Sequence, residues 1–414
     1  MEVSQLDYDV IVVGAGPAGS TAAEEVASHG FRVLIIEEHP FVGARQHCTG
    51  KLSVNAAKEL SIKTLKVMAE LRGAVFHSPN GTQLTVERNE TQAYIIDRED
   101  LDLQLASNAV SSGASLSTST RAIGIEVKET NANVLVSSQV GEEIRSCRVV
   151  VGADGVGSFV ARKAGLYSKS SAELRLGAQE EFLGVSSTHS DFAQIFFGEN
   201  IAPGFFAWTV PSGSRRVKAG LCVKPGSGKS PIDWLNSFTS SNHNTSSWSK
   251  EATESRQVVH AIPTGGTLRK TVGDGIVIVG DAAGQVKSTT GGGLYYGILC
   301  ARLAGQTIVE SLERSEGTVP ATELKNYERR WRERIGDEIL FSCRARAFLD
   351  SLSDQEMDYI FQILENDKPL SKLIETVADI DYQSRIGKGL MARMAVSLMK
   401  KPRILQKATQ YLLI

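Results

Sequence analysis

A glycine-rich stretch near the N-terminus has the spacing of a phosphate-binding turn. The letters GAGPAG place Gly14, Gly16 and Gly19 in the pattern GxGxxG, with Ala18 directly before the last glycine. Glycines at these positions permit a tight turn and let a pyrophosphate approach the N-terminus of a helix, whose unpaired N–H groups favour an anion. Glu37 follows, and its carboxylate would accept hydrogen bonds from the ribose hydroxyls of an adenosine. These residues predict a dinucleotide site.

The elements around this turn have the order that such a site requires. The apolar run 9–13 predicts a strand, residues 20–28 predict a helix, and the apolar run 31–36 predicts a second strand that ends at Glu37. This order indicates a βαβ unit. The unit alone does not distinguish NAD from FAD.

Two later segments make that distinction through a family resemblance. Residues 152–155 read GADG after the buried run 149–151, and residues 280–283 read GDAA after the run 276–279. They resemble the second and third FAD fingerprints of the aromatic-hydroxylase-like flavoproteins. The resemblance implies FAD as the cofactor, because an NAD dehydrogenase would not need these segments.

The same resemblance assigns roles around the flavin. It implies that Asp281 holds the ribityl chain and that Gly292, Gly293 and Leu294 approach the pyrimidine edge. A helix beginning there would direct its N–H groups at flavin N1 and O2, where reduction places negative charge.

Two further residues resemble cofactor contacts of that superfamily. Arg98 opens a predicted helix over 98–111 and resembles the arginine that reaches the pyrophosphate and ribityl region. The alternative for Arg98 is a solvated arginine at a helix end. Ala122 begins the run 122–127, which resembles the strand whose backbone meets the adenine edge.

A local motif narrows the family. Residues 203–211 read PGFFAWTVP and resemble the PxxYxWxFP signature of geranylgeranyl reductases, with Phe206 in place of the tyrosine and Val210 in place of the phenylalanine. Cys48 and Thr49 begin a CTG segment that resembles the cysteine loop placed against the flavin in this family. Archaeal digeranylgeranylglycerophospholipid reductases combine these features, and the resemblance covers roughly the first 300 residues.

The resemblance implies reduction of isolated C=C bonds in geranylgeranyl chains of archaeal membrane lipid precursors, with hydride from reduced FAD. The sequence leaves open a quinone side chain or a prenylated pigment as the preferred substrate. Phe205, Phe206 and Trp208 would line an apolar tunnel for the long prenyl chain. Alternatively they are ordinary sheet core. Cys48 is the candidate catalytic residue, and two roles stay open for it, donating the proton or shaping the pocket as a small apolar side chain.

The sequence leaves the other partners of the reaction open. No second GxGxxG lies in a βαβ context, so ferredoxin, a deazaflavin or NAD(P)H could each supply electrons. The phosphate of a lipid head would favour cations, and Arg215, Arg216, Lys218 and Lys287 are available without a spacing argument that selects among them.

The segment 388–414 mixes apolar residues with lysines and arginines, which is typical of a basic amphipathic segment able to lie on an anionic membrane. A terminal helix packed on its domain with a solvated basic face would have the same composition. With no signal-peptide pattern and no apolar run of roughly 18 residues, we expect a cytoplasmic protein in peripheral contact with the inner face of the membrane.

The expected architecture is α/β (α+β): a Rossmann-like FAD-binding domain, an inserted antiparallel β-sheet substrate domain and a C-terminal helical region. The predicted bounds are 1–74 plus 97–168 plus 270–305 for the first, 75–96 plus 169–269 for the second and 306–414 for the third. The polar stretch 237–249 is expected to be a surface loop.

Composition excludes several other classes. A formal net charge of −2 without a basic stripe argues against nucleic acid, and five scattered cysteines without a CxxC pair argue against a zinc site. The alternatives that remain are a flavin-dependent aromatic hydroxylase, a halogenase and a non-catalytic prenyl binder. The halogenase lysine is missing from 72–80, and a non-catalytic prenyl binder would lack the flavin fingerprints that this chain retains.

Overall fold

The computed structural model describes residues 6–44, 47–62, 64–167, 173–185, 190–242 and 245–412. The chain forms two compact units, each made of three segments. Unit 1 comprises Met1–Gln46, Arg98–Glu173 and Pro263–Ile339, and unit 2 comprises His47–Asp97, Leu174–Ile262 and Leu340–Ile414. The three domains expected from the sequence have other bounds and stay a prediction.

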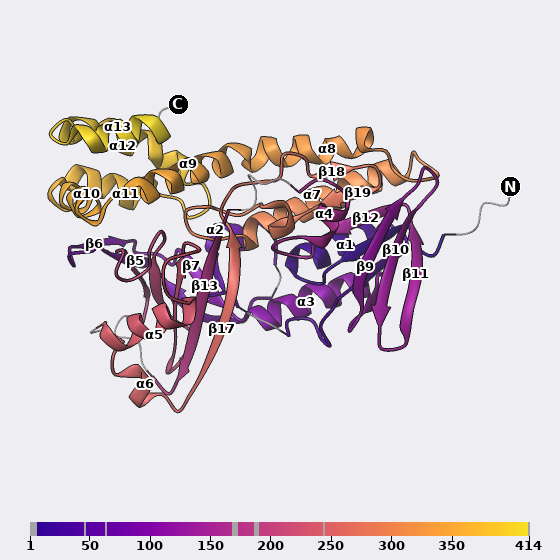
Figure 1. Cartoon of the computed structure of the whole chain (residues 1–414), viewed down its shortest axis with the longest axis horizontal. Coiled ribbons are helices and arrows are strands. Elements are labelled where there is room, and N and C mark those ends of the chain that lie inside the picture. The colour runs from indigo at the N-terminus through magenta and orange to yellow at the C-terminus, as the bar shows by residue number, and fades with distance from the viewer. Residues whose placement is uncertain are drawn as a thin grey trace. The chain divides into compact units, whose positions relative to one another are not determined.

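Unit 1 is built on a six-stranded sheet in the order β18-β19-β12-β1-β2-β8. Its strands β12, β18 and β19 are labelled in Figure 1. The strands from β19 to β8 are parallel, and β18 runs antiparallel to β19. Every residue of β1, β2 and β12 is buried, as expected for parallel strands covered on both faces. The strands are β1 Val10–Val13, β2 Val33–Ile36, β8 Ser115–Ser117, β12 Val149–Gly152, β18 Val272–Gly273 and β19 Ile276–Ile278.

Helices and a smaller sheet complete unit 1. Helix α7 lies against α1 at short range, since a Cβ on Gly305 would come within 2.5 Å of the Glu25 Cβ. The helical elements are α1 Pro17–Ala27, α3 Arg98–Ser111, α4 Phe159–Lys163, the 3₁₀ turn η2 Gly280–Ala283, α7 Leu294–Leu312, α8 Ala321–Trp331 and the π-helical turn η3 Arg332–Gly336. The antiparallel strands β9 Arg121–Val127, β10 Ala132–Ser138 and β11 Gly141–Cys147 form the smaller sheet.

Unit 2 is built on a seven-stranded sheet in the order β17-β13-β16-β15-β14-β5-β6. Its strands are β5 Gly73–His77, β6 Gln83–Glu87, β13 Leu174–Leu183, β14 Phe192–Phe196, β15 Ala207–Pro211, β16 Arg216–Val223 and β17 Glu254–Pro263. A three-stranded sheet accompanies it, with β3 Lys51–Ser53, β4 Val67–Leu71, β7 Ala93–Ile96 and the short helix α2 Val54–Glu59. The antiparallel sheet expected from the sequence is therefore present, with one parallel pair between β14 and β5.

One face of the seven-stranded sheet packs under α5 Pro231–Ser241 and α6 Trp248–Glu251, where Phe238 and Trp248 are buried with Ala207 of β15. The expectation of a surface loop over 237–249 was therefore wrong for much of this stretch. Ser230 caps α5 with Pro231 as its first residue, and Leu235 and Phe238 supply the apolar face. The Ser- and Asn-rich composition of 237–249 did not predict this helix, because its N-cap Ser230 and its first residue Pro231 lie before that stretch.

The C-terminal helices of unit 2 pack on its other side. Leu398 and Ile404 are buried beside Leu84 of β6 and Phe361. The helices are α9 Asp337–Ser351, α10 Asp354–Asn366, α11 Lys368–Val377, α12 Ser384–Leu398 and α13 Pro402–Leu412. Within the described ranges, no helix combines the length and the apolar character needed to cross a membrane.

Candidate functional site

Two glycines of the turn in unit 1 are required by close packing, and a third one faces open space. Gly14 has a φ of +103°, and a Cβ there would lie 2.4 Å from the Ala153 carbonyl oxygen. A Cβ on Gly19 would lie 1.9 Å from the Gly14 oxygen. A Cβ on Gly16 would meet nothing within 4 Å. Among the described residues, no atom fills the space beside Gly16, and a pyrophosphate needs that space to approach the turn.

The N-terminus of α1 is suited to an anion. Gly16 occupies the N-cap, no side chain caps the helix, and no acidic residue lies in its first turn. The first N–H groups of a helix have no partner within it, and together with the helix dipole they favour a negative group. Gly16 and Ala18 therefore lie where the sequence analysis expects a phosphate.

Glu37 is nearly buried at the same turn. One carboxylate oxygen accepts from the Ala15 N–H at 2.9 Å, and the other accepts from His39, at 3.0 Å from its backbone N. The backbone of Glu37 pairs with the bend after β8: its N–H donates to the Ser117 oxygen, and its own oxygen accepts from Thr120 N. The acid is thus fixed at the glycine turn.

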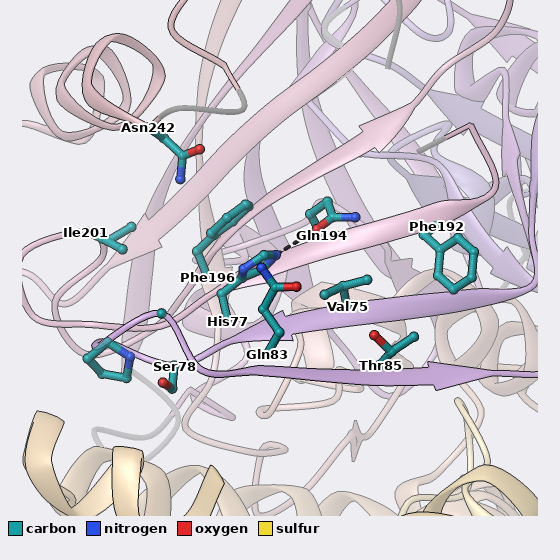
Figure 2. Close-up of a pocket in the computed structure, with 12 residues that line it drawn as sticks. Val75, His77, Ser78, Gln83, Thr85, Phe192, Gln194, Phe196, Ile201 and Asn242 are labelled. Atoms are coloured by element: carbon teal, nitrogen blue, oxygen red, sulfur yellow. Dashed lines mark hydrogen bonds between the residues drawn. The ribbon is translucent and has the colours of Figure 1, made fainter. Parts of the chain in front are cut away.

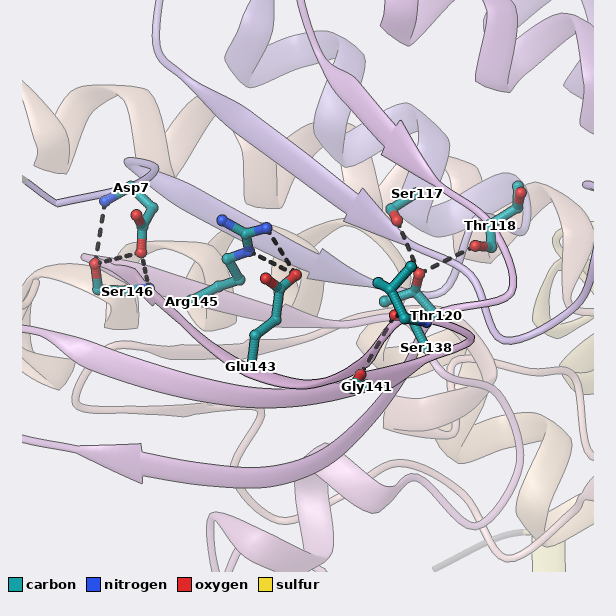
Figure 3. Close-up of polar contacts among 10 residues, drawn as sticks. Asp7, Ser117, Thr118, Thr120, Ser138, Gly141, Glu143, Arg145 and Ser146 are labelled. Carbon is teal, nitrogen blue, oxygen red and sulfur yellow. Dashed lines mark hydrogen bonds and ion pairs between the residues drawn. The ribbon is translucent and has the colours of Figure 1, made fainter.

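The bend after β8 is itself held by side chains. The hydroxyls of Ser117 and Thr120 lie 2.8 Å apart, and Thr120 also donates to the Thr118 oxygen at 3.0 Å (Figure 3). Ala122 follows on β9 and is buried. The bend therefore links the backbone of Glu37 to the start of β9, where the sequence analysis expects the adenine edge.

Arg98 is not a solvated arginine. It is the first residue of α3, its side chain is 13% exposed, and its guanidinium pairs with Asp102 at 3.0 Å.

Asp154, from the second fingerprint, has a structural role. Its carboxylate accepts hydrogen bonds from the Ser158 hydroxyl at 2.6 Å and from the Val160 N–H at 3.0 Å, at the start of α4. Burial raises the pKa of the Asp154 carboxyl above its usual range.

The third fingerprint meets the start of α7. A Cβ on Gly293 would lie 2.7 Å from a carboxylate oxygen of Asp281, and a Cβ on Gly292 would lie 2.9 Å from Lys287 Cε. Gly293 is the N-cap of α7, Leu294 is its first residue, and no side chain caps this helix either. The structure thus brings together all four residues predicted for the ribityl chain and pyrimidine edge.

A buried network behind this turn escaped the sequence analysis. The Gln285 side chain accepts from Gly280 N at 2.8 Å and donates to the Tyr327 hydroxyl at 2.8 Å, and that hydroxyl donates to the Ile278 oxygen at 3.0 Å. Burial raises the pKa of Tyr327 well above its usual value, so the hydroxyl stays a donor. Helix α8 therefore holds the turn on which Asp281 lies.

We expect Tyr327→Phe to weaken FAD binding, although Tyr327 is not one of the residues expected to contact the cofactor. The change removes the bond to Ile278 and leaves the Gln285 amide without an acceptor, a loss of about 1–3 kcal/mol in a buried site. The dissociation constant for FAD, measured by fluorescence titration of apoprotein, should rise by about fivefold or more. Tyr359→Phe is the matched control, since its hydroxyl bonds Ser397 in unit 2. Equal FAD affinity in both variants would contradict the role of the network.

In unit 2, the cysteine loop is fixed on the seven-stranded sheet. Thr49 donates to the Gln179 side chain on β13 at 2.8 Å, and Lys218 on β16 donates to the Thr49 oxygen at 3.3 Å. Gly50 has a φ of +84°, and its N–H lies 3.3 Å from Cys48 Sγ. The loop is thus positioned by side chains from two strands.

The residue before the cysteine contacts the edge strand of the sheet. The rings of His47 and His260 stack with their centroids 5.1 Å apart. Burial, and then the neighbouring His47, lower the pKa of His260 to about 4. His260 on β17 is therefore a neutral imidazole at neutral pH.

This lowered pKa makes unit 2 sensitive to acid. An unfolded histidine has a pKa of about 6.5, so between that value and about 4 the unfolded state binds the extra proton and the free energy of unfolding falls as the pH falls. We expect His260→Gln to reduce this loss by about 2 kcal/mol between about pH 7 and pH 4.5. Urea titrations at both pH values would measure it, with the exposed His29→Gln as control. Parallel pH profiles for wild type and His260→Gln would refute the prediction.

The aromatic motif forms one buried cluster on a single face of the sheet. Phe205 and Phe206 stack at 4.5 Å, and the Phe206 and Trp208 rings meet edge-on at 5.9 Å. A Cβ on Gly220 would lie 2.4 Å from the Trp208 ring, so the indole lies over this bare point of β16. The indole N–H is buried without a partner among the described residues.

The strand register places this tryptophan in the row that holds the cysteine loop. Trp208 is paired with Gly220, and Gly220 is paired with Gln179, the residue that binds Thr49. Side chains of directly paired residues lie on the same face of a sheet. The Trp208 ring and the Cys48 loop therefore share one face of unit 2.

A buried arginine fixes the start of the aromatic motif. Arg175 is fully buried, donates to the Gly204 oxygen at 3.0 Å and is paired with Asp350 of α9. Asp350 also pairs with Arg346 at 2.7 Å. The guanidinium of Arg346 lies 5.0 Å from the centre of the Phe205 ring. These contacts tie α9 to the turn that presents the aromatic residues.

Comparison with known proteins agrees with this geometry. The sequence model of the FAD binding domain family matches residues 7–340. Digeranylgeranylglycerophospholipid reductase 2 of Methanothermobacter thermautotrophicus is 34% identical over 377 residues, which cover 89% of this chain and 94% of the relative. The chain belongs to the digeranylgeranylglycerophospholipid reductase family. A reductase of that name from Methanocaldococcus jannaschii is 32% identical over 360 residues, covering 86% of this chain and 90% of the relative.

Solved structures share the fold. A geranylgeranyl bacteriochlorophyll reductase-like protein from Thermoplasma acidophilum superposes with a TM-score of 0.82 at 23% identity, covering 98% of this chain and 99% of that one. The p-nitrophenol 4-monooxygenase of Pseudomonas putida reaches 0.69 at 15% identity, covering 89% and 96%. The family members are flavoproteins, and FAD is the cofactor of this chain.

The residues of unit 1 fit FAD. The open point at Gly16 and the uncapped start of α1 would hold the pyrophosphate, Glu37 the adenosine ribose, and Asp281 with the start of α7 the ribityl chain and flavin edge. Cys48 and Thr49 lie in unit 2, and their contact with the flavin stays a prediction.

Gln179, Gly220 and Gln285 escaped the sequence analysis. Only Gly220 carried a usable signal, because a glycine inside a strand often marks a site where another group approaches closely. Gln179 acts through Thr49, 130 residues away, and Gln285 connects the nearby Gly280 to Tyr327, 42 residues away.

Proposed function

We propose that this flavoenzyme reduces isolated C=C bonds in the geranylgeranyl chains of a digeranylgeranylglycerophospholipid. Family membership supports the reaction, since the two archaeal relatives carry the name of that reductase. The observation in the structure that carries the proposal is the shared face of Trp208 and the Cys48 loop, with Gly220 leaving room for the indole. That face offers an apolar wall beside a thiol.

The surroundings of the thiol suit an unactivated alkene. Bound FAD, when reduced, supplies the hydride. Without a conjugated carbonyl the alkene accepts hydride poorly, so close positioning and exclusion of water must lower the barrier. The buried rings of Phe206 and Trp208 exclude water and hold the chain. The Cys48 thiol donates the proton to the second carbon, and Lys218 beside Thr49 offers a cation for the phosphate of the head.

Anaerobic incubation with dithionite and digeranylgeranylglyceryl phosphate tests the proposal by mass spectrometry. The expected product gains two hydrogens for each reduced bond, and Cys48→Ala should lower the rate by about tenfold or more with full FAD content. No mass gain, together with oxygen-dependent turnover of an aromatic compound, would favour hydroxylation. An unchanged rate in Cys48→Ala would remove the thiol from the chemistry. Running the same assay with ferredoxin, a deazaflavin or NAD(P)H in place of dithionite would identify the electron donor.

For membrane contact we propose a narrower surface than the whole segment 388–414. Ile404 packs in the core, and Lys407 is bound to Glu356 at 2.6 Å, so neither faces a membrane. Residues 413–414 lie outside the described residues, as do the side chains of Lys388, Met394 and Val396. Between α12 and α13 lies an exposed corner, the basic corner, made of Met399, Lys400, Lys401 and Arg403, with Met399 62% exposed.

The occupant of the basic corner is an anionic lipid surface, because exposed cations surround an exposed apolar side chain. Cosedimentation with phosphatidylglycerol vesicles should fall by about fivefold or more in the double variant Lys400→Glu/Lys401→Glu and should weaken with salt. Lys270→Glu/Lys325→Glu makes the same charge change on exposed residues of unit 1 and serves as control. Equal loss in both double variants would indicate net charge alone.

A further inference from the structure

The outer face of the seven-stranded sheet of unit 2 is hollowed beside α5. The helix packs on β13 and β16, and a cavity of about 600 Å³ lies on β5, β6 and β14 beyond it (Figure 2). Asn242, directly after α5, lies at its margin. The proposed reduction does not use this hollow.

The register shows that the hollow lies on the opposite side of the sheet from the aromatic motif. Gln194 is paired with Val75 of β5, and Phe196 with His77, so these four side chains share one face. Ile195, between them on β14, points the other way and packs with the cluster that contains Trp208. Since successive side chains of a strand alternate between faces, the hollow is separate from the reaction face.

The side-chain amide of Gln194 is a polar group in the lining of the hollow. Its side chain is 4% exposed, and its oxygen accepts from His77 Nε2 at 2.7 Å (Figure 2). The imidazole is fixed in turn by Phe196, on which it stacks with ring centroids 4.3 Å apart. Among the residues that the structure describes, the amide nitrogen of Gln194 has no hydrogen-bond partner. Turning the amide over would leave its oxygen unpaired instead, so one polar atom there lacks a partner either way.

A buried N–H without an acceptor is unfavourable, and a bound acceptor would relieve it. The chemistry of the walls restricts what that acceptor belongs to. None of the twelve lining residues is Asp, Glu, Lys or Arg, so the walls offer neither a carboxylate for a hard cation nor a fixed positive charge for a phosphate. Arg72, which lies over the outer ring Phe192, is engaged by Asp191 and Glu87.

The apolar part of the walls is flat and partly aromatic. Phe192, Phe196, Val75 and Ile201 line the same hollow as Gln194, and pockets of this kind combine apolar walls with a few polar groups that orient the ligand. We propose that the hollow binds a neutral ring compound whose carbonyl oxygen accepts a hydrogen bond from the Gln194 amide. This site goes beyond the proposed reduction and does not depend on it.

Benzamide is the probe, because it is neutral and carries one carbonyl on one ring. Titrated into the FAD-loaded protein and followed by saturation-transfer NMR, benzamide should bind saturably, and benzoate should bind at least about fivefold more weakly. Gln194→Leu should weaken benzamide by about tenfold or more. Gln362→Leu makes the same change on an exposed residue of α10 and should leave its affinity unchanged.

A second variant, Gln194→Glu, tests the proposal if Gln194→Leu does not fold. Gln194→Glu keeps the size of the side chain and removes the N–H donor, while its carboxylate can pair with His77, so it should still lose benzamide. A thermal unfolding scan of each variant reports whether it is folded. Absence of saturable binding by wild type would overturn the proposal, and so would equal affinity in both Gln194 variants and wild type. Lipid reduction, assayed on the same samples, reports on the reaction face and should be unchanged in these variants.

Discussion

A Gly16→Val variant should purify as a folded but colourless protein. Gly16 has a φ of −69°, which any residue adopts, and its Cβ would enter open space, so the fold tolerates a side chain there. That open space is where the pyrophosphate must approach the start of α1. We expect the dissociation constant for FAD to rise by about 100-fold or more, roughly 2.7 kcal/mol, in a fluorescence titration of apoprotein.

Two companion variants separate the cofactor cradle from packing. Gly19→Ala places a Cβ 1.9 Å from the Gly14 oxygen, so it should lower the thermal midpoint as well as FAD affinity. Gly389→Val, at an exposed position of α12 in unit 2, should leave FAD affinity unchanged. A Gly16→Val protein that binds FAD like wild type would show that the second glycine is not at the phosphate.

The sequence predicted the cofactor site well because that site is built from local signals. A buried strand, a glycine turn and a helix follow one another along the chain, and the structure has β1 Val10–Val13, α1 Pro17–Ala27 and β2 Val33–Ile36 in that order. The same holds at Gly293, the N-cap of α7. Each of these elements is specified by residues within one short segment.

Contacts between distant segments could not be predicted in this way. Tyr327 of α8 holds the turn of Asp281 through Gln285, and Gln179 holds Thr49 across 130 residues. Hydrogen bonds of this kind leave no period or spacing in a single sequence. The helix after Ser230 was missed for a different reason, because composition was given more weight than its cap and apolar face.

The largest effect on the proposed reduction is expected from Gly220→Ala. Its Cβ would lie 2.4 Å from the Trp208 ring, so the indole must leave the surface of β16. Because the residues that would hold the pyrophosphate, the ribose and the ribityl chain lie in unit 1, the protein should keep its FAD, while kcat/KM for digeranylgeranylglyceryl phosphate falls by about 100-fold. Gly124→Ala, on β9 of unit 1, is a matched change at a strand glycine, where the added Cβ would lie 3.1 Å from the Leu135 Cβ instead of 2.4 Å from an aromatic ring.

The double variant Trp208→Ala/Gly220→Ala distinguishes a lost wall from a damaged fold. Removing the indole removes the clash, so the thermal midpoint of the double variant should recover relative to Gly220→Ala alone, and this coupling between neighbours is what a mutant cycle measures. Activity should not recover, because the ring itself is missing from the face that holds Cys48. Wild-type turnover in Trp208→Ala would refute the tunnel wall, whereas recovery of turnover in the double variant would mean that Gly220→Ala had acted only through strain in the sheet. Inactivity with recovered stability assigns the Trp208 ring to the binding of the prenyl chain.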